Sequence, residues 1–424
     1  MAPKLKLALI SHTFQINYYA RRWELFAQKH PDIDVYLLAP SVVKWYPKKD
    51  YSYGNSKTTK GKEIDNGNFH VRLFNPIFKR SFLSWNIKEL LSDIKPDVFY
   101  HVGFHTQISL VQIGRIMRKR FPESKLILHS MRGPNFDLKI EKTPCSVKEW
   151  ISRRLKYVYY SSIWHYVKKH YKAVFCHYPG AVECFRKEGY DGPVYMQTQV
   201  GVNTEWFHPD EESRRVIRDK YNLGDAYVFG SASRFSSEKG LDDIVAALPT
   251  KGNWKFLMMG SGSEADLSRL KKAISDRGLD DKIILTGFVD WYEITKYWNA
   301  IDCAIHVPRT TEHWVETFSL SAIQPQATMK PVIGNTSGSV PYQIGFPEMI
   351  VEEGDIKALH DKIQWVLENP DKAAKIGTEM YRRCINSFSV QHLNDMFYDT
   401  LIEDVMNNAF DEAKTDMTKY TPHN

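Results

Sequence analysis

Short apolar segments alternate with longer amphipathic segments along almost the whole chain of 424 residues, and this alternation limits the fold more than any other feature. The apolar segments are nearly continuous, as is typical of strands that are covered on both faces of a parallel sheet. They predict strands at residues 5–10, 34–38, 98–102, 126–129, 173–177, 194–199, 227–231, 255–259, 283–286, 303–307 and 331–333. The amphipathic segments predict helices, for example at residues 18–30, 241–248, 264–275 and 356–368. Alternation of this kind indicates an α/β protein.

The series of alternating segments occurs twice, so we expect two domains. A single core rarely grows beyond roughly 300 residues, which favours the same division. Residues 201–210 lie between the two series and are polar and proline-containing. We therefore predict a Rossmann-like domain at residues 1–203, a second at 204–388, and an amphipathic C-terminal helix at 389–412.

Composition narrows the setting in which the chain works. The five cysteines include no Cys-x-x-Cys pair, which argues against a zinc site or a disulfide framework and predicts a cytoplasmic setting. No segment reaches ~18 consecutive apolar residues, so we expect no membrane-spanning helix. The formal net charge of +7 permits attraction to phosphates or to an anionic membrane surface. We recognise no nucleic-acid-binding module and predict no nucleic-acid partner.

A long helix is predicted to begin after Ser146, because Ser146 and Glu149 form a capping-box pattern and no Gly or Pro follows until after Lys172. Aromatic residues recur along it every seven positions, at Trp150, Tyr157, Trp164 and Tyr171. Basic residues are interspersed with them. One interpretation is a helix that makes peripheral contact with the anionic surface at the inner face of a membrane. The other is that the aromatic side chains pack against the domain while the basic groups are solvated.

Two loops in the second half have features of a phosphate site. Ligands of a parallel sheet bind beyond the carboxyl ends of the strands, where loops lead into helix N-termini. The loop after residue 231 carries Arg234 and Lys239, and two cations suit a diphosphate because they neutralise the charge of a departing one. The loop after residue 259 carries Gly260 and Gly262, which let the backbone approach a ligand. Taken singly, each loop also fits an ordinary surface turn.

Two further loops follow predicted strands. Gly287 ends one strand, and Val289 begins a connection that can pass over a base ring. Glu316 precedes small residues that can open a helix, and Gly338 and Ser339 follow a buried strand. Backbone amides at such positions can hold sugar hydroxyls and phosphate oxygens.

In this order and spacing, the segments resemble glycosyltransferase family 4, whose members have the GT-B architecture of two Rossmann-like domains facing across a cleft. The loop with Arg234 and Lys239 is similar to the family's G-R-x-x-x-E-K-G element, and the next two loops to its G-x-G-x-x turn and G-F/Y-V strand end. Residues 316–333 resemble the E-G-F-G-L-x-x-x-E-A-M-A-x-G-x-P-V-I signature. Residues 200–209 are similar to the hinge G-V-D-x-x-x-F-x-P, with Asn203 in place of the aspartate.

The resemblance implies a retaining glycosyltransferase that moves a sugar from a UDP- or GDP-type nucleotide sugar to a glycan, a glycolipid or another hydroxyl acceptor, without a metal or a further cofactor. Arg234 and Lys239 would stabilise the departing diphosphate, Glu316 would orient the donor sugar, and His129 would contact the sugar or phosphate. The alternative for His129 is a hydrogen-bonded histidine at the end of a strand. The resemblance assigns donor binding to Gly260, Gly262, Gly287, Phe288, Val289, Thr317, Phe318, Ser319, Leu320 and Gln324. It places the acceptor in the first domain, where residues 45–60 and the capped helix are candidates, and returns the C-terminal helix to that domain.

The chain departs from the family pattern at several positions. Gln324 replaces a glutamate that accepts hydrogen bonds from the ribose, which predicts weaker donor binding. Thr317 and Ser319 replace glycines, and Pro325 predicts that the helix there begins late or is kinked. The first loop, residues 11–17, lacks glycine, which also argues against a dehydrogenase. These departures leave two alternatives open: a non-catalytic or weakly active GT-B binding protein, and a nucleotide-sugar epimerase.

Overall fold

The computed structural model describes residues 4–15, 17–43, 59–60, 62–77, 83–131, 146–312 and 314–409. These residues form two compact units. The chain passes from unit 1 to unit 2 after Gln199 and returns to unit 1 at Asn394. The sequence places these two boundaries at residues 203 and 388. Residues 45–58 of the expected acceptor loop and residues 410–412 of the expected C-terminal helix lie outside the described ranges.

Unit 1 is built on a sheet of eight strands in the order β10-β9-β8-β7-β1-β2-β6-β5. All neighbours are parallel except β5 and β6. The strands are β1 (Leu5–Ile10), β2 (Ile33–Pro40), β5 (Ile64–Asn66), β6 (Phe69–Phe74), β7 (Val98–Gly103), β8 (Lys125–Ser130), β9 (Ala173–Cys176) and β10 (Val194–Met196). A separate antiparallel pair consists of β3 (Val42–Val43) and β4 (Thr59–Lys60). Every residue of β7 is buried, as expected for a central strand covered on both faces.

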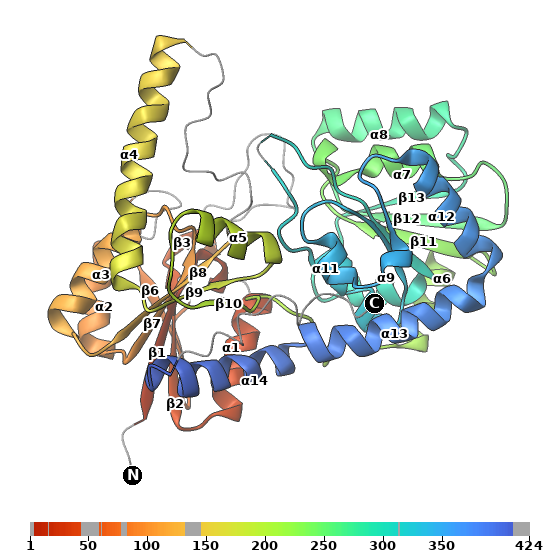
Figure 1. Cartoon of the computed structure of the whole chain (residues 1–424). Coiled ribbons are helices and arrows are strands. Elements are labelled where there is room, and N and C mark those ends of the chain that lie inside the picture. Colours follow the sequence, from red (N-terminus) through yellow and green to blue (C-terminus); the bar gives the residue numbers. More distant parts are fainter. Residues whose placement is uncertain are drawn as a thin grey trace. The chain divides into compact units, whose positions relative to one another are not determined.

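Helices cover this sheet, with α2 and α3 on one side of the strands and α1 and α14 on the other (Figure 1). They are the 3-10 helix η1 (His12–Gln15), α1 (Asn17–Lys29), α2 (Ile87–Ile94), α3 (Ser109–Arg120), α4 (Val147–His170), α5 (Pro179–Lys187), α14 (Val390–Asp399) and its π-helical continuation η5 (Thr400–Met406). No helix in the described ranges is long and apolar enough to cross a membrane.

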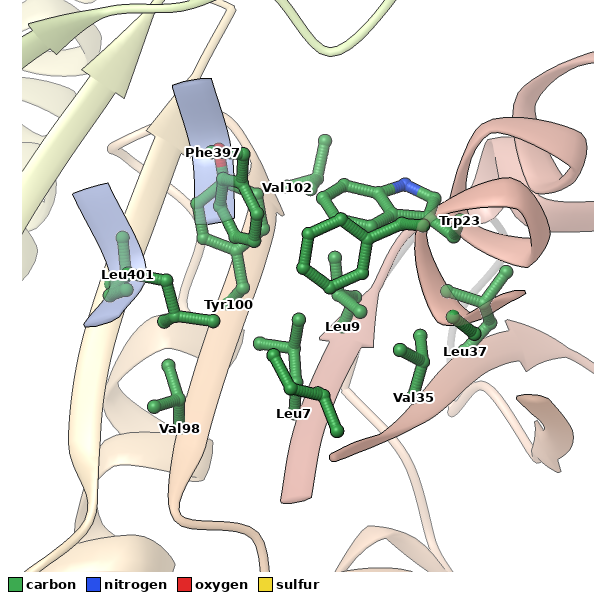
Figure 2. Packing of buried hydrophobic residues seen from close by; sticks show 14 of the residues in the cluster. Leu7, Leu9, Trp23, Val35, Leu37, Val98, Tyr100, Val102, Phe397 and Leu401 are labelled. Atoms are coloured by element: carbon green, nitrogen blue, oxygen red, sulfur yellow. The ribbon is translucent and has the colours of Figure 1, made fainter. Parts of the chain in front are cut away.

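The C-terminal helix completes the core of unit 1. Phe397 and Leu401 lie among the side chains of the first strands and of α1 (Figure 2). The Phe397 ring meets the Trp23 ring edge to face, with centroids 5.1 Å apart. A second link is polar, because the buried Tyr195 hydroxyl donates to Asp404 over 2.7 Å. The predicted return of the C-terminal helix to the first domain is therefore confirmed.

Unit 2 is built on a sheet of six parallel strands in the order β13-β12-β11-β14-β15-β16. The strands are β11 (Tyr227–Ala232), β12 (Trp254–Met259), β13 (Ile283–Gly287), β14 (Cys303–His306), β15 (Val332–Asn335) and β16 (Ile350–Val351). Its helices are α6 (Glu211–Lys220), η2 (Ser237–Lys239), α7 (Leu241–Ala247), α8 (Glu264–Asp276), α9 (Ile294–Ala300), α10 (Leu320–Ile323), η3 (Gln326–Thr328), α11 (Val340–Ile344), η4 (Pro347–Met349), α12 (Ile356–Glu368) and α13 (Pro370–Phe388). The predicted fold class of two parallel α/β domains is confirmed.

Each of the eleven predicted strands overlaps a strand of the structure. Strand β6 was not predicted, because His70 and Arg72 interrupt its apolar residues and it lies next to the edge strand β5. Of the two predictions for the helix at Pro325, a late start or a kink, the structure shows an interruption at the proline. Helix α10 begins at Leu320 and ends before Pro325, and the chain continues past the proline as the 3-10 helix η3, because a proline in a helix interior removes a backbone hydrogen bond.

Candidate functional site

A pocket of about 190 Å³ opens beyond the carboxyl ends of β11, β12 and β13 in unit 2. Its walls come from the loops after these three strands and from α10. Six of the predicted site residues line it: Arg234, Gly260, Phe288, Val289, Leu320 and Gln324. The other lining residues are Ala232, Ser233, Met259, Ser261, Trp291, Ile294 and Ser321. The wall is mostly apolar, and Arg234 is the one cation among the described residues that line it. Such a composition suits a flat ring with a charged group at one end.

The glycines after β12 allow the loops of β11 and β12 to meet. Gly260 has φ +138°, and a Cβ atom there would lie 1.8 Å from the carbonyl oxygen of Ser233. A Cβ atom on Gly262 would lie 2.8 Å from Cβ of Phe235. These positions therefore require glycine to bring the two loops together at the pocket.

An ion pair lies on the same edge of the sheet, over β11 and its neighbour β14. Lys239 Nζ is 2.8 Å from Glu316 Oε2, and both side chains are largely buried. The Lys239 ammonium group also lies 4.2 Å from the centre of the Trp314 ring. His306, the last residue of β14, brings its Nε2 atom within 3.8 Å of the same Glu316 oxygen. The structure therefore brings together Lys239 and Glu316, two site residues that the sequence predicted. His306 and Trp314 lie beside them and were not predicted.

Close backbone contacts fix this ion pair. Gly240 has φ +69°, and a Cβ atom there would lie 1.8 Å from the carbonyl oxygen of Val307. Gly338 has φ +53°, and its Cβ atom would lie 2.0 Å from the carbonyl oxygen of Glu316. The amide of Ser339 donates to that same oxygen over 2.8 Å. The loops after β11, β14 and β15 therefore converge on Glu316.

Burial keeps His306 neutral. Its pKa falls to about 3, first because the ring is buried and second because Lys239 is close. The signal for His306 in the sequence is a polar residue at the end of an otherwise apolar strand, Cys303–His306.

Arg234 lies in the wall of the pocket and remains about one third exposed. Its guanidinium group pairs with Glu238 Oε1 at 3.2 Å, one turn further along the loop. Glu238 also accepts a hydrogen bond from Ser236 over 2.7 Å. The loop therefore carries both predicted cations, one facing the pocket and one paired with Glu316.

Gln324 is buried, and its side chain has a protein partner that the sequence did not predict. Nε1 of the buried Trp298 donates to Gln324 Oε1 over 3.1 Å. The amide therefore already accepts one hydrogen bond within the wall of the pocket.

The remaining predicted donor-binding residues lie outside the pocket wall. Ser319 is fixed by Gln343, whose Oε1 accepts from the Ser319 amide over 2.9 Å and whose Nε2 donates to the Ser319 carbonyl over 2.9 Å. The ring of Phe318 packs edge to face against Phe388, with centroids 5.8 Å apart. Thr317 lies between these positions and Glu316, and Gly287 ends β13 with φ +77° and open space around it.

His129 lies in unit 1, at the end of β8, and is fully buried. Its Nδ1 atom is 3.2 Å from the Tyr100 hydroxyl, and its Nε2 atom is 3.3 Å from Nδ1 of His177. Burial, with His177 and Arg22 nearby, lowers its pKa well below the usual range. These contacts fit the hydrogen-bonded histidine that was the alternative interpretation, and a role at the donor stays a prediction.

The part of the chain that carries the pocket and the ion pair matches a family model. The model described as "Glycosyl transferases group 1" matches residues 213–383. Residues 213–383 are therefore similar to the group 1 glycosyltransferases.

Characterised proteins similar to this chain include two mannosyltransferases. The GDP-mannose-dependent alpha-(1-6)-phosphatidylinositol monomannoside mannosyltransferases of Mycolicibacterium smegmatis and Mycobacterium tuberculosis are 26% and 27% identical over 185 residues. The capsular polysaccharide biosynthesis glycosyltransferase CapM of Staphylococcus aureus is 26% identical over 199 residues. The aligned segment covers 42% of this chain and 48% of each mannosyltransferase, and 45% of this chain and 50% of CapM. The chain therefore spans about half the length of the curated relatives it matches.

Solved structures resemble this chain over nearly its full described length. The sucrose-phosphate synthase of Thermosynechococcus elongatus is 16% identical with a TM-score of 0.67, covering 94% of this chain and 100% of that one. A glycosyltransferase of Rickettsia africae is 18% identical with a TM-score of 0.67, covering 96% and 100%. HepE of Anabaena, solved with UDP-glucose, is 16% identical with a TM-score of 0.65, covering 94% and 100%. These likenesses confirm the GT-B fold that the sequence predicted.

Proposed function

We propose that this chain is a glycosyltransferase that moves a sugar from a nucleoside-diphosphate donor to a hydroxyl of a lipid-linked or glycan acceptor. One observation carries the proposal: the loop after β11 contributes Arg234 to the pocket and Lys239 to the ion pair with Glu316. A nucleoside in the pocket would direct its diphosphate along this loop. The similar proteins are named as a GDP-mannose-dependent mannosyltransferase and a capsular polysaccharide biosynthesis glycosyltransferase, which supports this proposal and favours GDP over UDP.

The proposed mechanism assigns a separate task to each side chain. Arg234 and Lys239 neutralise the charge that develops on the diphosphate as the bond to the sugar breaks. Glu316 holds Lys239 in place and accepts a hydrogen bond from the donor sugar. The acceptor hydroxyl attacks the face that the diphosphate leaves, its proton passes to a phosphate oxygen, and the anomeric configuration is retained. The two cations perform the charge neutralisation, so we propose that turnover needs no divalent metal.

Nucleotide binding is the first test. Thermal unfolding is measured with GDP, UDP, ADP, CMP and dTDP, each with EDTA and with magnesium. A ligand at 100 times its dissociation constant stabilises the folded protein by roughly 2.7 kcal/mol. We expect GDP to give the largest shift, with EDTA and magnesium equivalent. A shift that appears only with magnesium would contradict the metal-free mechanism, and the absence of any nucleotide shift would contradict the donor site.

Turnover is the second test. GDP-mannose is supplied with lipid-linked and soluble glycan acceptors, and the anomeric configuration of the product is read by NMR. We expect an α-linked product from the α-linked donor, and an inverted product would contradict retention. Donor incubated alone separates the alternatives: slow hydrolysis supports a transferase, an altered sugar supports an epimerase, and binding without turnover supports a GT-B binding protein. The contact between Trp298 and Gln324 is the observation that favours the last of these.

The proposed acceptor class sets the place of the reaction. A lipid-linked acceptor lies at a membrane surface, and the name of the Mycolicibacterium relative contains phosphatidylinositol, an anionic lipid. We therefore propose that the chain works at the cytoplasmic face of a membrane, in peripheral contact with it.

A further inference from the structure

The two halves of helix α4 differ sharply in how they contact the rest of unit 1. In its second half, Ile163, Trp164 and Val167 are buried. Trp164 Nε1 donates to the Glu188 carbonyl over 3.1 Å, and the hydroxyl of Tyr171, just past the end of the helix, donates to the Leu110 carbonyl over 2.9 Å. The first half of the helix extends beyond the neighbouring helices α2 and α3 (Figure 1).

The projecting half exposes an unusual amount of apolar surface. Among the described residues, fourteen large hydrophobic side chains are exposed, and seven of them lie in this half or one residue past it: Val147, Trp150, Ile151, Leu155, Tyr157, Val158 and Tyr159. Leu155 and Val158 are 67% and 63% exposed. The interpretation that the aromatic side chains pack against the domain thus holds for Trp164 and Tyr171 but is wrong for Trp150 and Tyr157.

Four of these exposed side chains share one face. Val147, Ile151, Leu155 and Val158 follow the i, i+4, i+8, i+11 spacing of a helical stripe, and Trp150 borders it. At 100° per residue, Ile163 and Val167 lie roughly 160° and 200° around the helix from Val147. The apolar stripe of the first half therefore faces away from the side by which the second half packs on unit 1.

Positive charge accompanies the stripe. The same half carries Lys148, Arg153, Arg154 and Lys156. Its one acidic residue, Glu149, accepts hydrogen bonds from the Ser146 amide and hydroxyl at the N-cap, over 2.9 Å and 3.0 Å. Arg154 lies over the Trp150 ring at 5.2 Å from its centre. A second copy of this helix would bring like charges together, whereas an anionic lipid surface is complementary in both charge and apolarity.

We infer that the projecting half of α4 is the docking surface of this protein on anionic membranes. The apolar stripe enters the boundary between headgroups and acyl chains, with Trp150 and Tyr157 at headgroup depth. Lys148 and Arg154, which flank the stripe on its two sides, contact lipid phosphates. The inference rests on the proposed function only for the choice of a lipid-linked acceptor, because vesicle binding needs no donor and no turnover.

Vesicle flotation of the full chain tests the inference. The vesicles contain equal parts of phosphatidylcholine and phosphatidylglycerol, or phosphatidylcholine alone. We expect binding to the anionic vesicles, weakening as salt rises from about 0.1 M to about 1 M. The triple variant Trp150→Ser, Leu155→Ser, Val158→Ser should lose affinity by about tenfold or more. The matched control replaces three side chains exposed elsewhere, Ile64→Ser, Trp85→Ser and Val216→Ser, and should bind as the unmodified chain does.

Several outcomes would overturn the inference. These are equal binding to both kinds of vesicle, a triple variant that still floats, or a control that loses binding to the same extent. A concentration-dependent dimer that the triple variant abolishes would assign the stripe to self-association instead. Because all substituted side chains are exposed, thermal unfolding and GDP binding should be unchanged. Loss of both would show that the triple variant had unfolded. The variant Lys148→Glu with Arg154→Glu, which keeps the apolar stripe, would then decide: loss of anionic-vesicle binding would support the inference, and retention would overturn it.

Discussion

Nζ of Lys239 lies 2.8 Å from Oε2 of Glu316, and this ion pair joins the loop after β11 to the loop after β14 across two neighbouring strands. Both side chains are largely buried, with 14% and 8% of their surfaces exposed. A buried ion pair of this kind tolerates the loss of both partners better than the loss of one, because a single deletion leaves an uncompensated charge.

Single and double substitutions of this pair make the first prediction. Lys239→Met and Glu316→Gln should each lower the free energy of unfolding by about 3 kcal/mol, and the double variant should lose less than the sum of the two. Urea unfolding measures this. The exposed pair Lys272 and Asp276 is the control, because Lys272→Met should cost less than about 1 kcal/mol. Transfer should fall by about a hundredfold in Lys239→Met and Glu316→Gln if these residues act as proposed. Equal costs for Lys239→Met and Lys272→Met would contradict the structural role of the pair.

Two glycines give a matched test of close approach. Gly240 and Gly287 have similar φ angles of +69° and +77°, but only Gly240 faces a neighbouring carbonyl oxygen, 1.8 Å from where its Cβ atom would lie. Gly287→Ala should cost about 1 kcal/mol of stability through backbone strain alone. Gly240→Ala should cost clearly more and should also weaken GDP binding, because the loop that carries Lys239 must move. Equal stability of the two alanine variants would contradict this account of the loop.

The sequence predicted the frame of the molecule well because its strands are buried on both faces. Continuous apolar runs such as Leu5–Ile10 and Tyr227–Ala232 have few alternatives to a parallel strand. Strand β6 was missed because its alternating pattern resembles that of any half-exposed segment. The role of Gly260 was also predictable from the sequence. It directly follows a buried strand, and a tight turn at such a position accepts few residue types other than glycine.

Contacts between distant segments were not predictable. His306 and Trp314 reach the Lys239–Glu316 pair only through the order of β11 and β14 in the sheet, which leaves no periodic trace in the sequence. The contact between Trp298 and Gln324 is of the same kind, because it joins α9 to the end of α10. On α4, the seven-residue spacing correctly placed Trp150, Tyr157 and Trp164 broadly on one face. It could not show where the body of unit 1 ends along the helix.

Gln324 offers a test of how the pocket recognises ribose. Gln324→Glu should still accept the Trp298 hydrogen bond and should offer a charged acceptor to a ribose hydroxyl. The difference between charged and neutral acceptors is about 1 kcal/mol, so GDP should bind about fivefold more tightly. Calorimetry with GDP and with a 2′,3′-dideoxy analogue measures this, and the gain should vanish with the analogue. A gain of equal size with both ligands would place the ribose elsewhere.

The partner of Gln324 can be tested separately. Trp298→Phe keeps most of the buried ring volume but removes the donor to Gln324 Oε1. Removing this donor from the buried amide should cost about 1–3 kcal/mol of stability. If urea unfolding showed no loss, the hydrogen bond would not be fixing the amide.

His306 should make stability depend on pH in a defined window. Its pKa of about 3 in the folded protein lies below the unfolded value of about 6.5, so the unfolded chain binds the extra proton between these two values. The free energy of unfolding should therefore fall as pH is lowered below about 6.5, by up to about 1.4 kcal/mol per pH unit for this one residue. His101 and His177, whose pKa values fall to about 3 and about 4 because of burial, add slopes of the same sign.

Urea unfolding of the unmodified chain and of His306→Gln tests this. Above pH 7 the stabilities of the two proteins should change in parallel with pH. Below pH 6 the unmodified chain should lose stability more steeply than the variant. The two slopes should differ by up to about 1.4 kcal/mol per pH unit, which corresponds to the uptake of one proton on unfolding. Identical slopes would mean that His306 already takes up a proton in the folded state. This result would contradict the conclusion that His306 is neutral beside Glu316.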